Sequence, residues 1–349
     1  MSTGKLTIDL GAVARNWRIL CGVHGGGAVA AVVKADAYGL GAARVAPALQ
    51  AAGCRHFFVA TPGEGDALRE ALGDGPMIAV LDGFAGTRRE RHPGVIPVLN
   101  SLDDIAAHEG EAVLHLDTGM SRLGLSPTEM EMLAAEPHRL DRVRLRYLMT
   151  HLTVAEEPDH PLNARQAERF EAACARLPPI PRSFANSSGI FLGPRFGSDL
   201  ARPGAALYGI NPRPGWPNPM EPVIRLALPI LQIREVGPGE TVGYGAAWRA
   251  TAPSRIATVA GGYADGIPRA WDGRGRGFLH GKEAPLVGRV SMDLMTFDVS
   301  AIPKARPGDW LEVIGPEQDA DAVAAAAGTI GYEILTRLGR RFQRGYVGA

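Results

Sequence analysis

Short apolar runs alternate with helix-forming segments along the first two thirds of the chain, and this alternation constrains the fold more than any other feature. Eight runs have the composition of buried strands, and they span residues 28–34, 56–61, 76–82, 94–100, 111–117, 143–151, 182–187 and 198–203. Strands that alternate with helices form parallel sheets, and eight of them can close into a barrel. We therefore predict a (β/α)8 barrel of the TIM type over residues 8–222.

Helix signals occupy several of the links between these runs. The stretch SPTE at 126–129 is a capping box with proline at the first helical position. Asn163 is predicted to cap a helix whose apolar face includes Phe170 and Leu177. Pro47 should fall in the first turn of its helix, because proline disrupts a helix interior. The links after the third and seventh runs are too short for a full helix.

The character of the sequence changes after a proline-rich break at residues 211–223, NPRPGWPNPMEPV. Beyond the break come three strand-like runs and one helical run, at 225–236, 253–260, 285–299 and 321–335. We predict a mostly β domain over residues 224–349, and we expect residues 1–7 to pair with it.

The composition excludes several classes of protein. The formal net charge is zero and the basic residues form no cluster, so we expect no positively charged surface of the kind that binds nucleic acid. Three scattered cysteines without a CxxC pair argue against a disulfide framework or a zinc site, and we predict no metal. The N-terminal residues carry no signal-peptide pattern, and no apolar run is long enough to cross a membrane. We expect a neutral cytoplasmic enzyme.

The apolar run AVAAVV ends on Lys34, an unusual residue in this chain. Lysine occurs only four times, although Lys and Arg together number 37, and Lys34 is the only lysine within residues 8–222. In a TIM barrel, reactive groups lie at the C-terminal ends of strands and in the loops that follow them. A lone lysine at a strand end is more often simply solvated, so its neighbours decide the interpretation.

Polar residues end four other runs, and a barrel would bring them to the same end as Lys34. They are Arg122 after the fifth run, His151 at the sixth, Ser187 at the seventh and Arg202 at the eighth. Each alone has an ordinary interpretation, as a surface cation, a half-buried histidine or a turn residue. Their convergence at one end of a barrel predicts a functional site.

The stretch ARPGAALYG at 201–209 indicates the ligand. Gly204 lets the backbone approach a ligand closely, and the amides of Gly204 and Ala205 can face an anion if a short helix begins there. TIM barrels often bind phosphate with the loops after strands seven and eight, and Ser187 could add a hydroxyl. A phosphate at one end and the Lys34 amine at the other fit pyridoxal 5'-phosphate, an aldehyde that forms a Schiff base with lysine.

The motifs VVKADAYGLG, LDTGMSRLG, ANSSG, ARPGAALYG, VGYG, GYADG and GRVSMD occur in the order seen in alanine racemases, and the match runs through nearly the whole chain. The chain thus resembles this family of fold-type III pyridoxal-phosphate enzymes. The resemblance implies a cytoplasmic homodimer that interconverts L- and D-alanine and supplies D-alanine for cell-wall peptidoglycan.

The resemblance also implies a role for each matching residue. Lys34 would carry the cofactor and serve as one catalytic base. The other cofactor-binding residues would be Tyr38, Ser187, Gly204 and Ala205 at the phosphate, His151 near the pyridine ring and Arg202 at the pyridine nitrogen. Arginine stays protonated at any working pH, so it leaves no proton on that nitrogen and the ring becomes a weaker electron sink.

Racemisation needs bases on opposite faces of Cα, and the second base matches Tyr244 in the C-terminal domain of the other subunit. A tyrosine beside glycines is more often structural, and it acts as a base near neutral pH only where cations favour its ionised form. His151 and Arg202 are the expected sources of that charge. The implied substrate-binding residues are Arg122 for the carboxylate, Met292 from the partner domain and Tyr263 at the entry.

Three positions depart from the family. Many members have a lysine that becomes carbamylated and braces Arg122, but this chain has His115 there, so no carbamate can form. His115, a bound anion or nothing would then orient Arg122. Ser183 replaces a common histidine. Arg340 stands where some relatives have a phosphate-facing tyrosine, a role left open for Tyr346.

Three alternatives remain open at this point. A racemase of serine or of broader amino-acid range would differ in pocket width, which the sequence does not show. A non-catalytic pyridoxal-phosphate-binding barrel would lack the C-terminal domain that carries Tyr244. A decarboxylase of the related fold would place an acidic residue where this chain has Arg202.

Overall fold

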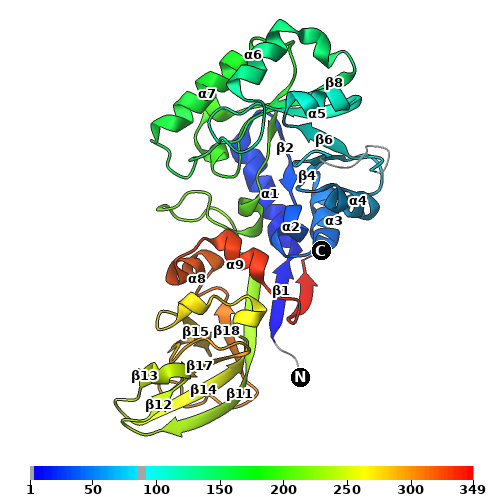
Figure 1. Ribbon diagram of the computed structural model, residues 1–349. Helices are drawn as coiled ribbons and strands as arrows, with labels where there is room; N and C mark the ends of the chain where they lie inside the picture. The colour runs from blue at the N-terminus through cyan, green and yellow to red at the C-terminus, as the bar shows by residue number, and fades with distance from the viewer. Residues whose placement is uncertain (1–3, 85–91, 349) are drawn as a thin grey trace. The chain divides into compact units, whose positions relative to one another are not determined.

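The computed structural model describes residues 4–84 and 92–348. The chain divides into two compact units, Val13–Glu221 and a second unit that combines Met1–Ala12 with Pro222–Ala349. The first unit alternates strands and helices, and the second is mostly β (Figure 1).

The first unit is built around a parallel barrel with strand order β2-β10-β9-β8-β7-β6-β5-β4-β3. The strands are β2 (Ala28–Val29), β3 (Ala31–Val32), β4 (His56–Val59), β5 (Met77–Val80), β6 (Ile96–Leu99), β7 (Gly110–His115), β8 (Val143–Met149), β9 (Arg182–Ser183) and β10 (Leu200–Ala201). β2 and β3 are two halves of one strand interrupted at Ala30, whose N–H donates to the Ala201 carbonyl at 2.8 Å. This strand pairs with β10 and with β4, so the sheet closes and the predicted (β/α)8 fold is confirmed.

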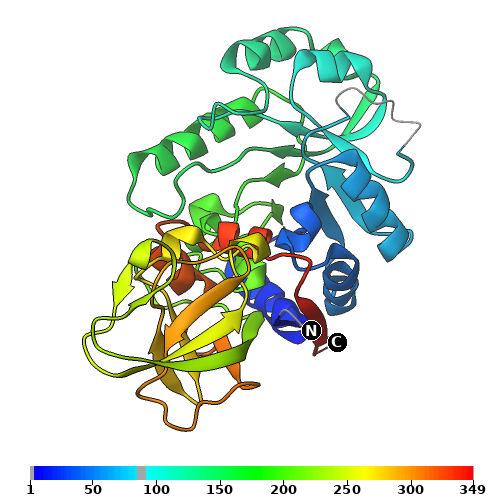
Figure 2. The ribbon, with the colours of Figure 1, turned by 60° about the horizontal axis from the view of Figure 1, so that its bottom comes forward.

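Helices cover the outside of the barrel, and α3 and α4 lie side by side there (Figure 2). The helices of this unit are α1 (Leu10–His24), α2 (Lys34–Tyr38), α3 (Ala42–Ala52), α4 (Pro62–Leu72), α5 (Leu102–Ala107), α6 (Pro127–Ala135) and α7 (Pro161–Cys174). The predicted capping box begins α6: Ser126 Oγ accepts the Glu129 N–H at 3.3 Å, and the Glu129 carboxylate accepts the Ser126 N–H at 2.9 Å. The link after β9 holds only short 3-10 turns, as its length predicted, and the link after β5 lies partly outside the described residues.

Two helix predictions were wrong. α7 is capped by His160, whose ring accepts a backbone N–H at 3.2 Å, because proline follows it at the first helical position. Asn163 is instead buried inside this helix, where its side-chain amide donates to the Glu157 carbonyl at 2.9 Å. Pro47 lies in the interior of α3 rather than in its first turn, because the helix already begins at Ala42.

The alternation of side chains along β7 decides what faces the barrel interior. Leu114 and Leu116 belong to a buried core cluster with residues of α5, α6 and α7. The side chain of His115, which lies between them in the sequence, therefore points into the barrel. His115 is buried there at 6 % exposure.

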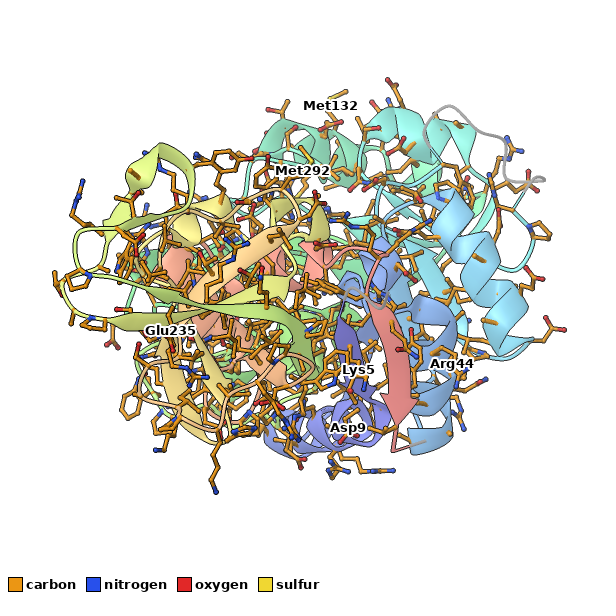
Figure 3. All side chains as sticks on the ribbon, turned by 90° about the horizontal axis from the view of Figure 1, so that it is seen from below. Lys5, Asp9, Arg44, Met132, Glu235 and Met292 are labelled. Atoms are coloured by element: carbon orange, nitrogen blue, oxygen red, sulfur yellow. The ribbon has the colours of Figure 1, made fainter. Side chains whose placement is uncertain are left out.

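The second unit joins both ends of the chain in one sheet. β1 pairs antiparallel with β11 and parallel with β19, and Figure 3 shows Lys5 and Asp9 at the ends of β1. The sheet order is β16-β15-β18-β11-β1-β19, and β14 and β17 continue from β11. The strands are β1 (Lys5–Asp9), β11 (Ile224–Val236), β12 (Thr241–Val242), β13 (Trp248–Arg249), β14 (Ser254–Ala260), β15 (Arg276–Leu279), β16 (Lys282–Pro285), β17 (Leu294–Asp298), β18 (Trp310–Ile314) and β19 (Gln343–Val347).

The predicted mostly β character of this unit is confirmed, with two differences in detail. The single helix expected at 321–335 is divided into α8 (Ala320–Ala327) and α9 (Gly331–Arg337), because Gly328 takes a left-handed φ of 71°. The run at 285–299 is not one strand: Pro285 ends β16, and Leu294–Asp298 forms β17. Within the described ranges, no helix has the length and apolar character needed to cross a membrane.

Candidate active site

Lys34 follows β3 directly, at the C-terminal end of the barrel strands. Its side chain is half-buried, and its amine makes no hydrogen bond or ion pair with a described residue. Burial lowers the pKa of the Lys34 amine, and the charge of Arg122 lowers it further. The carboxylates of Asp82 and Glu64 oppose this shift without cancelling it. The lowered pKa enlarges the share of neutral amine, which is the form that attacks a carbonyl.

A left-handed turn, Ala35–Tyr38, follows Lys34. All of its residues have φ between 51° and 55°. Left-handed backbone costs about 1–2 kcal/mol for each residue with a side chain, so surrounding contacts must hold the turn. Asp36 Oδ1 accepts a backbone N–H from the start of α3 at 2.7 Å, and Glu64 Oε1 accepts the Ala35 N–H at 2.8 Å. These supports fix the direction in which the side chains at both ends of the turn leave the backbone.

Tyr38, Ser187 and Gly204 lie together at the end of this turn. The Tyr38 ring packs on Tyr208, with ring centroids 4.8 Å apart. A Cβ atom on Gly204 would lie 2.2 Å from the Tyr38 hydroxyl oxygen, so any other residue there would displace Tyr38. Ser187 Oγ accepts the Gly204 N–H at 3.0 Å and the Ala206 N–H at 3.3 Å. The structure thus brings together the residues predicted to bind a phosphate.

Arg202 is buried beside two neutral acceptors. Its Nη1 donates to Ser183 Oγ at 2.6 Å, and its Nη2 donates to the Thr150 carbonyl at 2.5 Å. Burial lowers the pKa of the guanidinium to about 10, so the side chain stays cationic at neutral pH. Its Nε–H makes no hydrogen bond with a described residue, so it can donate to an acceptor held at the barrel end.

Two histidines at the barrel end are neutral at neutral pH. Burial and then the charge of Arg202 lower the pKa of His151 to about 3, and the same two causes lower the pKa of His115 to about 4. The charge of Arg122 contributes to both shifts. The expectation that His151 supplies positive charge is therefore wrong. Arg202 and Arg122 are the arginines that supply charge to the site.

Arg122 projects from a loop that Asp117 shapes. A bridge between Leu116 and Leu125 closes the base of this loop. Within it, the Asp117 carboxylate accepts the backbone N–H groups of residues 119–121 at 2.9–3.1 Å. Arg122 is exposed and forms no hydrogen bond or ion pair with a described residue. Its guanidinium is therefore available to bind a carboxylate.

Tyr244, Tyr263 and Met292 lie in the second unit, where Figure 3 labels Met292. All three side chains are exposed, that of Tyr244 to 71 %. Their loops adjoin. Gly243 and Gly245, on either side of Tyr244, lie against residues 288–289, and the Tyr263 N–H donates to the Ser291 carbonyl at 3.0 Å. Tyr346 lies in β19, opposite Ile8 of β1.

Several residues that contact the predicted site residues or their neighbours were not identified from the sequence. Asn100 and Thr150 each end an apolar run at its C-terminal side, which is the signal that identified His151, and they could have been found in the same way. Glu64 and Gln166 lie in α4 and α7, where nothing in the sequence distinguishes them from surface residues. Gln166 Nε2 donates to the His151 carbonyl at 2.9 Å and so ties α7 to the loop after β8.

The sequence matches known families along nearly its whole length. The model of the alanine racemase N-terminal domain matches residues 8–212, and the model of the alanine racemase C-terminal domain matches residues 223–346. The chain is 57 % identical to an alanine racemase of Acidiphilium cryptum, with 99 % of each chain covered. It is 49 % identical to a catabolic alanine racemase of Mesorhizobium japonicum, with 98 % of this chain and 93 % of the relative covered.

Solved structures show the same relationship. Alanine racemase from Bartonella henselae, crystallised with covalently bound pyridoxal phosphate, matches with a TM-score of 0.94 at 39 % identity and covers 99 % of this chain and 100 % of its own. The biosynthetic alanine racemase from Pseudomonas aeruginosa matches with a TM-score of 0.92 at 35 % identity, over 99 % of this chain and 100 % of its own. Both domain models match and the fold agrees, and the chain belongs to the alanine racemase family.

Proposed function

We propose that this chain interconverts L- and D-alanine with pyridoxal 5'-phosphate attached to Lys34. The observation that carries the proposal is the environment of Lys34, a half-buried amine with a lowered pKa at the C-terminal end of the barrel strands. A relative at 57 % identity bears the name alanine racemase, and the Bartonella henselae protein is described with the covalently bound cofactor.

The groups around Lys34 suit this cofactor. The two arginines near it are cations without a carboxylate partner among the described residues, and the two histidines are neutral. Such a site favours a ligand that carries a phosphate together with a substrate that carries a carboxylate. When bound, the cofactor supplies an electron sink that stabilises negative charge at the substrate Cα.

Each residue then has a defined task. Lys34 holds the cofactor and moves a proton to and from one face of Cα. Arg202 keeps its own proton and presents Nε–H to the pyridine nitrogen, beside the neutral ring of His151. Arg122 binds the substrate carboxylate. The groups assigned to the phosphate are the Tyr38 and Ser187 hydroxyls and the Ala205 amide, beside Gly204, whose own N–H donates to Ser187 Oγ.

The second base is assigned to Tyr244 of the partner subunit in a cytoplasmic homodimer. A base on the opposite face of Cα is required, because a single base returns the proton to the side from which it took it. Tyr244, Tyr263 and Met292 form a contiguous exposed group, which suits residues that enter a neighbouring subunit's site. The D-alanine made in this way would serve peptidoglycan synthesis.

An assay of each D-amino acid tests the proposed function. Purified protein with pyridoxal phosphate is incubated separately with L-alanine, L-serine and larger L-amino acids, and each D-product is measured. D-alanine should form fastest. No D-alanine would refute the proposal, whereas faster formation of D-serine would reassign the substrate.

Reductive trapping tests the role of Lys34 separately. Borohydride reduction followed by peptide mapping should place the cofactor on the peptide that contains Lys34. Lys34→Ala should abolish activity, and Lys282→Ala, which removes another lysine from β16, should leave activity unchanged. Cofactor on any other lysine would contradict the assignment.

A further inference from the structure

His115 carries a buried nitrogen atom without a partner. The side chain is 6 % exposed and points into the barrel, and its Nε2 atom forms no hydrogen bond with a described residue. A polar atom left unpaired in a protein interior costs free energy, so its presence calls for an explanation.

The contacts of Asn100 establish which ring nitrogen of His115 carries the proton. Asn100 Nδ2 donates to the carbonyl oxygens of Leu81 at 3.0 Å and of Val98 at 3.2 Å. The amide oxygen of Asn100 is therefore the atom that faces His115 Nδ1 at 2.9 Å, and this oxygen can only accept. His115 therefore donates from Nδ1. Because burial and the nearby arginines lower the pKa of His115 to about 4, the ring is neutral at neutral pH, and Nε2 carries a lone pair and no proton.

The loop that carries Arg122 packs against this ring. A Cβ atom on Gly124 would lie 2.9 Å from His115 Cγ and 3.0 Å from Cδ2, so the loop touches the edge of the imidazole. The His115 carbonyl accepts the Leu125 N–H at 2.8 Å, which fixes the end of the same loop. The charge of Arg122 reaches the ring and contributes to its pKa shift.

Two arginines act on His115, and Arg122 has all its donors unused in the described part of the chain, whereas Arg202 keeps only its Nε–H, which the proposed function assigns to the cofactor. Arg202 already donates both Nη groups to oxygen acceptors at 2.5 and 2.6 Å. Arg122 donates to no described residue, and the carboxylate of its own loop, Asp117, is occupied by backbone N–H groups. Its long side chain can reach the ring on which its loop rests.

We propose that His115 is a positioning residue whose Nε2 lone pair accepts a hydrogen bond from the Arg122 guanidinium and orients it toward the substrate carboxylate. The inference rests on the proposed function, because that function assigns Arg122 to the substrate. A lone pair repels an anion, so this geometry disfavours a bound anion as the group that orients Arg122. A neutral acceptor also leaves the charge of Arg122 available to the substrate.

Steady-state kinetics of three variants test the proposal. His115→Phe removes the acceptor and should raise KM for both alanine enantiomers roughly tenfold, because a hydrogen bond to a charged group is lost. The value of kcat should change much less, because the lost contact orients the substrate in ground state and transition state alike. His115→Gln keeps a neutral acceptor and should restore most of the KM. His108→Phe is the matched control, because His108 is also 6 % exposed but hydrogen-bonds the Glu111 carbonyl.

The protonation state of the ring gives a readout that needs neither cofactor nor activity. Nitrogen NMR of histidine-labelled apoprotein should show His115 protonated on Nδ1 and bare on Nε2, with the His115→Phe spectrum identifying the signal. Asn100→Leu removes the acceptor of Nδ1–H, so it should populate the other tautomer and raise KM although His115 itself is intact.

The outcomes separate this inference from the proposed function. An unchanged KM in His115→Phe, or a proton on Nε2 in the apoprotein, would overturn the role of His115 even if the wild-type protein racemises alanine. A tenfold loss of kcat in place of a KM change, not restored by glutamine, would also overturn it, because it would indicate a purely structural role. Absence of racemase activity in the wild-type protein would instead refute the proposed function, and the tautomer would still be measurable.

Discussion

The Tyr38 hydroxyl fills the space that a side chain on residue 204 would need: a Cβ atom on Gly204 would lie 2.2 Å from the hydroxyl oxygen. Residue 204 has φ −122° and ψ −82°, outside the regions that residues with a side chain usually adopt, so the contact and the backbone both favour glycine. The position of Tyr38 therefore depends on the absence of a methyl group at residue 204, in the loop that follows β10.

Gly204→Ala should displace Tyr38 and weaken cofactor binding. Overpacking of this kind costs about 1–3 kcal/mol, which predicts at least a tenfold loss of apparent affinity for pyridoxal phosphate. Absorbance titration of the apoprotein measures the affinity. Gly63→Ala, in open space on α4, is the control and should leave the affinity unchanged. Equal affinities for both variants would show that Tyr38 does not contribute.

Ala35→Gly should stabilise the apoprotein, although Ala→Gly substitutions in helices usually destabilise. Glycine relieves left-handed strain of about 1–2 kcal/mol and costs about 0.4–1 kcal/mol in the unfolded chain, so the melting temperature should rise slightly. Ala67→Gly, at an exposed site in the middle of α4, should lower it, with a cost of about 1 kcal/mol. A lower melting temperature for both variants would contradict the assignment of strain to the turn.

Ser183→Ala should loosen Arg202. The substitution removes the hydroxyl that accepts from Arg202 Nη1 at 2.6 Å, a hydrogen bond to a charged group, and should lower kcat/KM about tenfold. Ser183→Thr keeps the hydroxyl and should recover most of the activity. Ser188→Ala removes another buried hydroxyl, one that lies 3.4 Å from Glu156, and serves as the control.

The stability of the apoprotein should fall as the pH drops below about 6.5. His151 and His115 have pKa values lowered to about 3 and about 4, so between those values and 6.5 the unfolded chain binds protons that the folded protein does not. Each histidine should therefore lower the free energy of unfolding by about 1.4 kcal/mol per pH unit over this range. Melting temperatures from pH 7 to pH 5 measure the slope, and replacing both histidines by glutamine should reduce it. An unchanged slope would mean that the rings are protonated in the folded protein.

Tyr244→Phe should separate proton exchange from racemisation. The equilibrium constant fixes the ratio of kcat/KM in the two directions, so the asymmetry must be sought in the exchange of the Cα proton. In deuterated water, the variant should still exchange the Cα proton of one enantiomer, through Lys34, and barely that of the other. We expect L-alanine to be the enantiomer that depends on Tyr244. Tyr263→Phe, which removes the hydroxyl of another exposed tyrosine, should exchange both. Equal, mild losses with both enantiomers would contradict the two-base assignment.

Most barrel strands could be predicted because they are apolar runs bounded by polar or turn residues, although β9 (Arg182–Ser183) is itself polar. The observed strands lie within the predicted runs or beside their ends, as β7 (Gly110–His115) does for the run at 111–117. The left-handed turn could not be predicted, because Ala35–Tyr38 contains none of the glycines that normally mark positive φ. Contacts from Glu64 and the start of α3 impose it, and such tertiary contacts leave no local pattern.

The site residues that stand at the ends of strands could be predicted from the sequence. Residues that only hold other site residues in place were missed. Lys34, His151 and Arg202 follow apolar runs directly, so barrel geometry alone brings them together. The neutrality of His151 could not be foreseen, because its pKa depends on burial and on the distance to Arg202. The roles of Tyr244 and Met292 remain predictions that rest on family resemblance.

Lys34 follows the strand formed by β2 and β3, and the two neighbours of this strand are synthesised at very different times. Residues 28–32 meet β4 soon after synthesis, but their other partner, β10, ends only at residue 201. β1 waits longer still, because its parallel partner β19 spans Gln343–Val347. A growing chain therefore exposes the Lys34 amine before the barrel around it exists. The proposed attachment of pyridoxal phosphate to Lys34 would then have to follow synthesis of β10, and a chain truncated before residue 200 should bind the cofactor poorly.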